Sequence, residues 1–431
     1  TKAQNTGIGG IVANKGGIVA CMNVKSTKLA FLSAHLAAHE GGNYYRTRCQ
    51  SITDIFNGAR VGNTSHLFDA SQISHHCFVL GDLNFRSDFG GNLTQKEKNK
   101  KAESILVKKD WVSLNSFDEL GKALLNRHCL SGFITPPCLF PPSFKVERRP
   151  GMFYKDQRTP SYTDRILWKS SVGQERSLSN IKYDCCPAFS TSDHKPVFGT
   201  FSLRTNTQFP SVQCPIKCYL NISNIRCFDT IVQDSSDSSF YLRFIVDPVG
   251  LLKIKNLNMQ DVGSFPCTNS QKLSFKRNIK WSQDIQLELE MLDMSLLTGS
   301  FLYCSLMAGK DKILGTVSLS LDKLCFPGLD EKIRKSHNKK NEHPNKRGRK
   351  FFKTRSSRML ARKKKQSKNQ KLTQNKKLIE NKKTIQSNKA FPDDILINHP
   401  FLKNGQKRGQ LKCTMHVWWY DDRDLSELEA E

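Results

Sequence analysis

The strongest constraint on the fold is an alternation of short apolar runs with longer polar segments, which extends over residues 1–204. The runs at 17–23, 28–34 and 77–80 have the length and composition of buried strands, and the polar segments between them have helical patterns. Strands that alternate with helices are typical of a sheet with helices packed on its faces. The sequence therefore predicts an α/β domain over residues 1–204.

Two segments of this region carry the signature of a helix N-terminus. Thr94 is followed three residues later by Glu97, and Ser116 is followed at the same distance by Glu119. In a capping box of this spacing, the hydroxyl and the carboxylate each accept a hydrogen bond from a backbone N–H of the other residue. We therefore expect helices to begin at Thr94 and at Ser116.

From about residue 212 the pattern changes to short strands separated by turns. Spacing of this kind predicts an antiparallel β-sandwich. A further alternating segment, Gln410–Tyr420, has the composition of one more strand. We expect the sandwich to comprise residues 212–328 together with residues 408–422. The strands expected in its first part lie at 218–222, 240–246, 272–275, 285–292, 301–307 and 314–321.

A strongly basic segment separates the two parts of this sandwich. Residues 331–390 contain 23 Lys and Arg against 3 Glu, so they carry +20 of the chain's net charge of +28. The segment is rich in Lys, Asn, Gln and Ser and poor in aromatic residues, a composition that cannot bury a core. We expect residues 331–407 to be a disordered insertion, which costs little because loop-closure entropy grows only logarithmically with length.

Three roles stay open for this basic insertion: a solvated segment without a partner, a contact for acidic lipid, or a contact for nucleic acid. Each basic residue near an acidic membrane contributes about 1 kcal/mol, so a few residues suffice for binding. The cluster Arg362–Lys365 has the composition of a nuclear address or a nucleic-acid patch.

The remaining composition excludes several classes of protein. No apolar run reaches the roughly 18 residues that a membrane-spanning helix needs. The 14 Cys lack the paired spacing of a zinc site, and we expect reduced thiols in a cytoplasmic protein. The first residues contain neither an initiator Met nor a secretory signal, so we interpret the chain as N-terminally truncated.

Four polar segments lie at the ends of apolar runs, where α/β sheets commonly place their functional sites. Taken singly, each has an ordinary structural explanation as a turn, a surface ion pair or a surface His. Their combination within one domain favours a functional site instead. The segments are Ser33–Glu40 with His35, Val79–Arg86 with Asp82 and Asn84, Arg158–Trp168 with Asp164, and Thr191–Phe198 with Asp193 and His194.

Together these segments resemble those of the inositol polyphosphate 5-phosphatases, within the DNase I-like endonuclease/exonuclease/phosphatase superfamily. Val79–Arg86 resembles the family motif W-x-G-D-x-N-[FY]-R, with Val-Leu before the Gly. Arg158–Leu167 resembles R-x-P-[SA]-[WY]-[CT]-D-R-[IV]-L, which distinguishes 5-phosphatases from related nucleases. Asn14–Gly17 and Ser192–Pro196 also resemble family segments. The likeness covers residues 1–204 and implies a DNase I-like four-layer α/β sandwich.

This resemblance implies a phosphoric monoester hydrolase. The hydrolysis needs a carboxylate to orient or deprotonate water, and cations to stabilise the charge that develops on the phosphate. By resemblance, Asp82 handles the attacking water, and Asn84 positions it with the phosphate. His194 hydrogen-bonds the scissile phosphate, Asp164 fixes the tautomer of His194, and His35 donates to a phosphate oxygen.

The resemblance also implies Mg2+ as cofactor, with Asp193 near the metal. The family's main metal ligand, a Glu in a short Gln-Glu segment, precedes the part of the domain at which this chain begins. No segment of the sequence replaces it, so we expect the chain alone to be a poor catalyst. The sequence leaves two interpretations of His39 open, as a site residue or as a structural His.

Substrate recognition is expected in the loop from Phe140 to Arg158, which resembles the family segment that grips the 4-phosphate of the headgroup. Asp156 lies where the family often has a basic residue, and a solvated basic loop is the alternative interpretation. The candidate substrate-binding residues are Arg86, Lys145, Tyr154, Lys155 and Arg158.

A 5-phosphatase domain followed by a C2-like sandwich resembles the domain order of the SHIP-type enzymes. This order implies a phosphoinositide 5-phosphatase acting on phosphatidylinositol 4,5-bisphosphate or 3,4,5-trisphosphate, in a cytoplasmic protein peripheral at membranes. We expect phosphoinositide lipids and an acidic membrane surface as partners, no calcium, and a monomer. Two alternatives stay open: a non-catalytic membrane-binding adaptor with a degenerate phosphatase fold, and a superfamily nuclease. The net charge favours the nuclease, whereas Pro160–Leu167 argues against nucleic acid.

Overall fold

The fold was analysed in a computed structural model of the 431-residue chain. It describes residues 1–7, 14–62, 68–205, 213–232, 239–247, 251–253, 265–273, 277–293, 297, 299–309, 312–321, 324 and 394–421. Residues 331–393 of the predicted basic insertion lie outside the described residues. None of the described helices is long and apolar enough to cross a membrane.

The first domain is built on a five-stranded mixed sheet. Its strands, in the order in which they pair, are β1 (Lys2–Asn5), β2 (Gly16–Val24), β3 (Thr27–His35), β4 (His76–Asp82) and β5 (Asp164–Ser170). Strands β3 and β4 run parallel, and the other neighbours run antiparallel. The central strands are almost continuously apolar because both faces of the sheet are covered.

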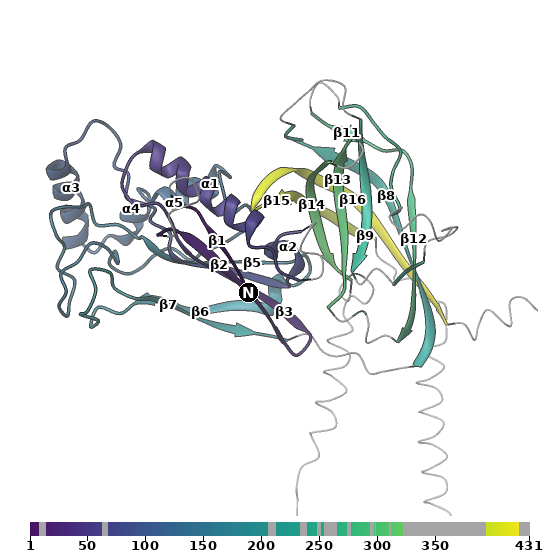
Figure 1. Ribbon diagram of the computed structural model, residues 1–431, viewed down its shortest axis with the longest axis horizontal. Coiled ribbons are helices and arrows are strands. Elements are labelled where there is room, and N and C mark those ends of the chain that lie inside the picture. Colours follow the sequence, from purple (N-terminus) through teal and green to yellow (C-terminus); the bar gives the residue numbers. More distant parts are fainter. Residues whose placement is uncertain are drawn as a thin grey trace, which may run out of the picture.

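Helices α1 (Gly42–Gly58) and α2 (Ala70–Ile73) cover one face of this sheet (Figure 1). Ile52, Ile55 and Phe56 of α1 are spaced so that they form one apolar stripe, and they share a buried cluster with side chains of the sheet. The stripe fixes the helix on the sheet. The other helices of the domain are α3 (Gln95–Val107), α4 (Trp111–Asn115) and α5 (Glu119–Leu125).

A two-stranded antiparallel sheet packs on the opposite face of the first sheet. It consists of β6 (Leu178–Cys185) and β7 (Val197–Leu203). The ring of Phe201 meets Phe78 and Trp168 edge-on, at centroid distances of 5.1 and 5.0 Å. Side chains of α3 and α4 share a buried cluster with β6 and β7. Helices and two sheets therefore stack in the described part of the domain, and the predicted α/β class is confirmed.

One predicted helix start is confirmed and the other is wrong. Thr94 and Glu97 form the capping box of α3, with each side chain bonded to the other residue's backbone N–H. Helix α5 is capped by Asp118 instead of Ser116, because the Asp118 carboxylate accepts from two N–H groups of the first turn. Glu119 consequently begins α5 with its side chain available for a different contact.

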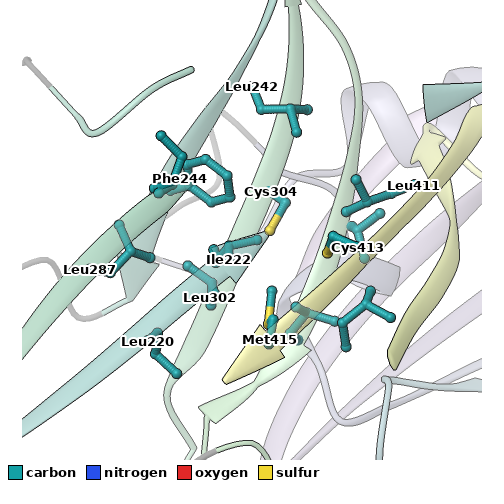
Figure 2. Packing of buried hydrophobic residues seen from close by; sticks show 14 of the residues in the cluster. Leu220, Ile222, Leu242, Phe244, Leu287, Leu302, Cys304, Leu411, Cys413 and Met415 are labelled. Atoms are coloured by element: carbon teal, nitrogen blue, oxygen red, sulfur yellow. The ribbon is translucent and has the colours of Figure 1, made fainter. Parts of the chain in front are cut away.

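The second domain is an antiparallel β-sandwich, as expected. Its strands are β8 (Gln213–Phe228), β9 (Phe240–Asp247), β10 (Leu252–Lys253), β11 (Ile279–Lys280), β12 (Ile285–Asp293), β13 (Phe301–Ala308), β14 (Lys312–Ser320), β15 (Ile395–Lys403) and β16 (Gln406–Asp421). They pair in the order β10-β12-β8-β16-β15-β14-β13-β9, with β11 on β8. Figure 2 shows Ile222 and Met415 on one side of the core, with Phe244 and Cys304 among the side chains packed against them.

The predicted end of the basic insertion is wrong. Strand β15 lies inside the range 331–407 that the sequence assigned to disorder, and it pairs with β16 over most of its length. Ile397 and Phe401 are buried in the sandwich core, but Pro400 and the polar residues around them obscure the strand pattern. The segment predicted at 272–275 is not seen as a strand, since residues 274–276 are not described and Gln271 forms only an isolated bridge.

The turn between β15 and β16 joins the second domain to the first. Asn404 and Gly405 adopt φ of 52° and 72°, which is typical of a two-residue hairpin. The carbonyl of Gly405 accepts from the backbone N–H of Ser131 at 2.8 Å. Nearby, Phe68 stacks on Tyr303 with ring centroids 4.0 Å apart. Backbone hydrogen bonding and aromatic packing therefore cross the domain boundary together.

Gly81 provides a test of the sheet geometry. It has a φ of 121°, and a Cβ there would lie 2.2 Å from the carbonyl oxygen of Ala34 on β3. We expect Gly81→Ala to lower the free energy of unfolding by about 2 kcal/mol or more, because a left-handed backbone and a clash add together. The matched control is Gly42→Ala, since nothing lies within 4 Å of a Cβ at Gly42. Equal unfolding free energies of the two variants in urea denaturation would contradict this geometry.

Candidate active site

One row of residues crosses the first sheet at the edge where the predicted site residues gather. In the strand register, Gly16 pairs with His35, His35 pairs with Asp82, and Asp82 pairs with Asp164. Neighbouring strands lie about 4.8 Å apart, so this register places side chains from distant parts of the sequence next to one another. The site is thus built on strand ends, which hold side chains more firmly than loops do.

Asp164 holds His194 in a fixed orientation. Its Oδ2 accepts from Nδ1 of His194 at 2.8 Å, from the hydroxyl of Ser143 at 2.6 Å and from the hydroxyl of Thr163 at 2.9 Å. The ring of Phe144 packs against the His194 ring at a centroid distance of 4.5 Å. Because Nδ1 is engaged by the carboxylate, Nε2 is the nitrogen with which His194 can act on a substrate.

Asn84 holds Asp82 from the other side. Its Nδ2 donates to Oδ2 of Asp82 and to the carbonyl of Leu36, both at 3.0 Å. Arg86 in turn donates to Oδ1 of Asn84 at 2.5 Å, so the amide cannot flip without losing these bonds. Asn84 has a φ of 56°, a left-handed conformation that Asn tolerates better than most residues.

Burial and mutual charge set the protonation of the central groups. Burial and the nearby Asp164 raise the pKa of Asp82 to about 6. Burial disfavours the charged ring of His194, but its hydrogen bond to Asp164 and the charges of Asp82 and Asp193 outweigh this effect and raise its pKa. Asp82 is therefore mainly ionised at neutral pH while His194 retains a proton on each nitrogen more readily than an ordinary His.

His35 contacts a lysine that the sequence did not single out as a site residue. Nε2 of His35 lies 2.5 Å from Nζ of Lys15 and 3.3 Å from Oδ2 of Asp82. One nitrogen cannot accept from Lys15 and donate to Asp82 at the same time. Burial and the Lys15 charge lower the pKa of His35, so a neutral ring that accepts from the Lys15 ammonium is the consistent assignment.

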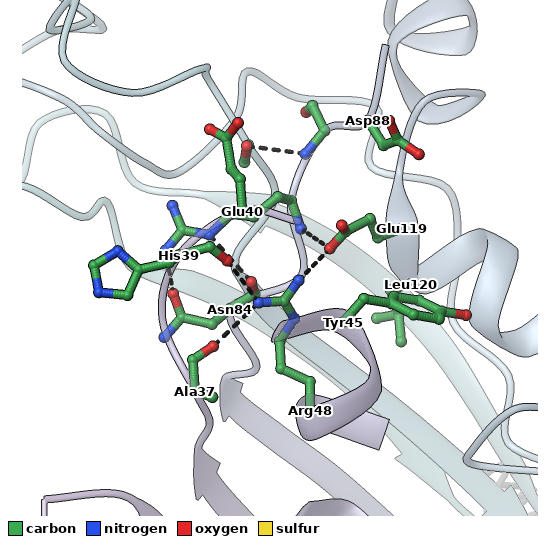
Figure 3. Close-up of polar contacts among 12 residues, drawn as sticks. Ala37, His39, Glu40, Tyr45, Arg48, Asn84, Asp88, Glu119 and Leu120 are labelled. Atoms are coloured by element: carbon green, nitrogen blue, oxygen red, sulfur yellow. Dashed lines mark hydrogen bonds and ion pairs between the residues drawn. The ribbon is translucent and has the colours of Figure 1, made fainter. Parts of the chain in front are cut away.

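A buried ion pair supports the backbone behind these residues (Figure 3). Arg48 of α1 donates to Oε2 of Glu119 at 2.5 Å, and the same oxygen accepts from the backbone N–H of Arg86 at 2.9 Å. Arg48 also donates to the carbonyls of Ala37 and His39, at 3.2 and 2.8 Å. The pair therefore connects α1 and α5 to the segments that follow β3 and β4. His39 contributes its carbonyl to this support.

The side chains of two predicted substrate-binding residues, Arg86 and Tyr154, point toward the protein interior. Arg86 is buried, donates to Asn84 through Nε and Nη2, and lies 4.6 Å from the centroid of the Phe144 ring. Tyr154 donates its hydroxyl to the carbonyl of Pro142 at 2.9 Å. These contacts favour a supporting role for both side chains.

The other three candidates, Lys145, Lys155 and Arg158, belong to the loop from Phe140 to Arg158 and lie closer to the protein surface. Nζ of Lys145 lies 3.9 Å from Oδ2 of Asp193 and 3.2 Å from Oε1 of Gln157. Lys155 and Arg158 are half-buried, and the backbone N–H of Lys155 donates to the carbonyl of Lys145 at 3.0 Å. Lys145, Lys155 and Arg158 are thus the candidates that retain charge toward a ligand.

Part of a cation site is present. One ligand atom each of Asp82, Asp164 and His194 lies within 4.8 Å of the others. Carboxylate oxygens suit a hard cation such as Mg2+, and a cation would relieve the repulsion that raises the pKa of Asp82. The two carboxylates fit such an ion as part of its ligand set. Asp193, the predicted metal residue, is outside this group and lies beside Lys145.

Sequence reasoning missed five residues that the structure places at or beneath the site: Lys15, Arg48, Glu119, Ser143 and Thr163. Lys15, Ser143 and Thr163 lie inside segments already singled out, so their position was a signal. Arg48 and Glu119 carried no such signal, because their contact joins residues that are 71 positions apart.

Comparisons with known proteins show which families the chain resembles. A sequence model of the endonuclease/exonuclease/phosphatase family 2 matches residues 1–200. Inositol polyphosphate 5-phosphatase K of Mus musculus is 29% identical over 296 residues, which cover 64% of this chain and 60% of that protein. Phosphatidylinositol 3,4,5-trisphosphate 5-phosphatase 2A of Danio rerio is 30% identical over 253 residues, which cover 56% of this chain and 19% of that protein. The chain thus spans less than two thirds of the length of either relative.

Among solved structures, one similar chain is the inositol polyphosphate 5-phosphatase domain of SPsynaptojanin in complex with inositol (1,4)-bisphosphate and calcium ion. It is 24% identical and covers 47% of this chain and 55% of that chain, with a TM-score of 0.37. A TM-score of this size adds no weight to the assignment.

Residues 1–200 are similar to the endonuclease/exonuclease/phosphatase family 2. The chain is also similar to inositol polyphosphate 5-phosphatases, in line with its motifs. The match to the mouse protein covers 64% of the chain and so extends beyond the first domain.

The Asp164–His194 pair can be tested without measuring activity. We expect Asp164→Asn to lower the pKa of His194, because the variant removes the negative charge and the accepting oxygen that raise it. The measurement is an NMR titration of the His194 ring. The control is Asp184→Asn, which removes a surface carboxylate paired with Lys182 on β6. This variant should leave the pKa of His194 unchanged. An unchanged His194 pKa in Asp164→Asn would show that the pair does not form.

Proposed function

We propose that this protein is a phosphoinositide 5-phosphatase that removes the 5-phosphate of phosphatidylinositol 4,5-bisphosphate or 3,4,5-trisphosphate at a membrane. The observation that carries the proposal is the convergence of Asp82, Asn84, Asp164 and His194 at one edge of the sheet. The names of the relatives support the substrate class, since one is a phosphatidylinositol 3,4,5-trisphosphate 5-phosphatase.

The proposed mechanism assigns one task to each group. Asp82 orients the attacking water and accepts its proton, for which a carboxylate with a pKa of about 6 is more basic than an ordinary Asp. His194 donates from Nε2 to an oxygen of the scissile phosphate, while Asp164 keeps the ring in that orientation. Lys15 adds positive charge beside His35, against the charge that develops on the phosphate.

Mg2+ is the proposed cofactor, held in part by Asp82 and Asp164. When bound, it would supply positive charge against the phosphate oxygens. Lys145, Lys155 and Arg158 are proposed to contact further phosphates of the headgroup, since their loop adjoins His194 through the bridge between Phe144 and His194. The sandwich is proposed to be C2-like and to face the membrane with the catalytic domain.

The decisive experiment measures phosphate release from vesicles that contain phosphatidylinositol 4,5-bisphosphate, with the protein in its full natural length and Mg2+ present. We expect His194→Ala and Asp82→Asn each to lower kcat by at least about 100-fold, because each removes a group that acts in the transition state. Asp54→Asn, an exposed carboxylate on α1, is the control.

Release at the wild-type rate by His194→Ala would refute the assignment. Vesicle binding without any release by the wild-type protein would instead establish the non-catalytic adaptor. Cleavage of DNA or RNA, with no phosphate released from the lipid, would establish the nuclease.

The pKa shifts predict the pH dependence of this activity. Asp82 acts as a base, so kcat/KM should fall as its carboxylate gains a proton, which occurs near pH 6 without a bound cation and at lower pH once Mg2+ stabilises the ionised form. His194 acts as a donor, so kcat/KM should also fall as the pH rises above its pKa, which is raised from the ordinary 6.5. A kcat/KM profile that stays flat from pH 5 to pH 9 would contradict both roles.

A further inference from the structure

A cavity of about 300 Å³ lies at the junction of the two domains, away from the candidate active site. The first domain lines it with the far end of β5 and with residues 171–178, and the second domain lines it with β14 and β15. Asp164 begins β5 whereas Lys169 lies five residues along it, so the cavity is about 17 Å from the site carboxylates. Neither the proposed mechanism nor the predicted motifs use it.

Lys169 gives the cavity a cationic group with spare hydrogen-bonding capacity. Its ammonium donates to the carbonyl of Ser71 at 3.0 Å, and an ammonium has three donors. Within the described part of the chain, no carboxylate forms an ion pair with it. Asp69 lies near enough to offset part of its charge; its Oδ1 accepts from Ser71, and its Oδ2 is buried without a hydrogen-bond partner among the described residues. Burial lowers the pKa of Lys169, as expected for a charge that lacks a close counter-ion.

Two hydroxyls in the same lining also lack partners in the described structure. The oxygens of Ser171, from the first domain, and Ser318, from β14, are buried without a hydrogen-bond partner. His399 of β15 lies in the lining as well, and burial lowers its pKa, so it is neutral at physiological pH. Glu175 is exposed and lies at the rim near His399. Buried polar groups usually have partners, so several unpaired ones around one cavity indicate a ligand.

The lining combines further polar residues, Ser71, Ser170 and Thr316, with an apolar part. Trp168, Leu178, Val317 and Leu402 contribute side chains from both domains, and the exposed Ile134 extends the apolar surface outward. Pockets that bind small molecules combine such walls with a few polar groups that fix the orientation of the ligand. A volume of about 300 Å³ is at the lower end of that class, so the ligand would be small.

We propose that this junction binds a small amphiphilic anion, a carboxylate on a medium-length apolar chain, whose acid group accepts hydrogen bonds from Lys169 and the two serine hydroxyls. Its chain lies against the apolar side chains of both domains. A ligand that contacts both domains stabilises their docked arrangement and raises the unfolding temperature, because it binds only when the two walls are together.

The test titrates octanoate, octylammonium and octanol into the full protein by isothermal titration calorimetry. We expect one octanoate to bind per chain, with an increase in melting temperature, and octylammonium not to bind. Lys169→Met keeps the length of the side chain and should weaken octanoate binding about tenfold or more, since a charge-assisted hydrogen bond is lost. Lys182→Met, at an exposed lysine on β6, is the matched control and should bind as the wild type does.

A second variant, Ser318→Leu, fills the cavity and should abolish binding while Lys169 stays in place. The proposal is overturned if octanoate does not bind at millimolar concentration, or if octylammonium binds equally well. It is also overturned if a folded Lys169→Met variant keeps the wild-type affinity. The comparison of the three ligands uses only the wild-type protein, so it decides the question even where a variant fails to fold.

Discussion

The repulsion between two half-buried carboxylates organises the candidate site of the first domain. Asp82 and Asp164 face each other across neighbouring strands, and neither is paired with a lysine or arginine among the described residues. Such an arrangement is costly, so the surrounding groups donate hydrogen bonds to it: Asn84 to one carboxylate, and Ser143, Thr163 and His194 to the other. The negative charge of these two carboxylates attracts a cation and stabilises a protonated imidazole.

The sequence predicted the site better than it predicted what supports the site. Asp82, Asn84, Asp164 and His194 each stand at or beside the end of a strand-like run. The register of the sheet makes Asp82 and Asp164 neighbours, and Asn84 and His194 reach them through hydrogen bonds. Local pattern was therefore sufficient for them. By contrast, Glu119 has the spacing of a capping-box residue, and only the tertiary contact with Arg48 shows that it belongs to a buried ion pair. Spacing along the chain carries no information about such a partner.

The same distinction explains the errors outside the site. The α/β class and the sandwich follow from periodicity, which many residues determine together. The start of β15 depends on a short segment in which Pro400 hides the pattern, and its strand form is fixed by pairing with β16. Tyr154 and Arg86 were predicted as ligand contacts by resemblance to family segments, but such a resemblance does not say which way a side chain points.

The β15–β16 hairpin, at the end of the described residues, connects the second domain to the first. Its turn accepts a backbone hydrogen bond from Ser131, and Gln406 donates to Thr53 of α1. Residues 395–421 therefore complete the surface of a domain encoded some 200 positions earlier. A chain cut after residue 204 would leave Phe68 without the ring of Tyr303 and would expose apolar surface to water. The two domains are separate in sequence pattern, but hydrogen bonds and buried aromatic packing join them.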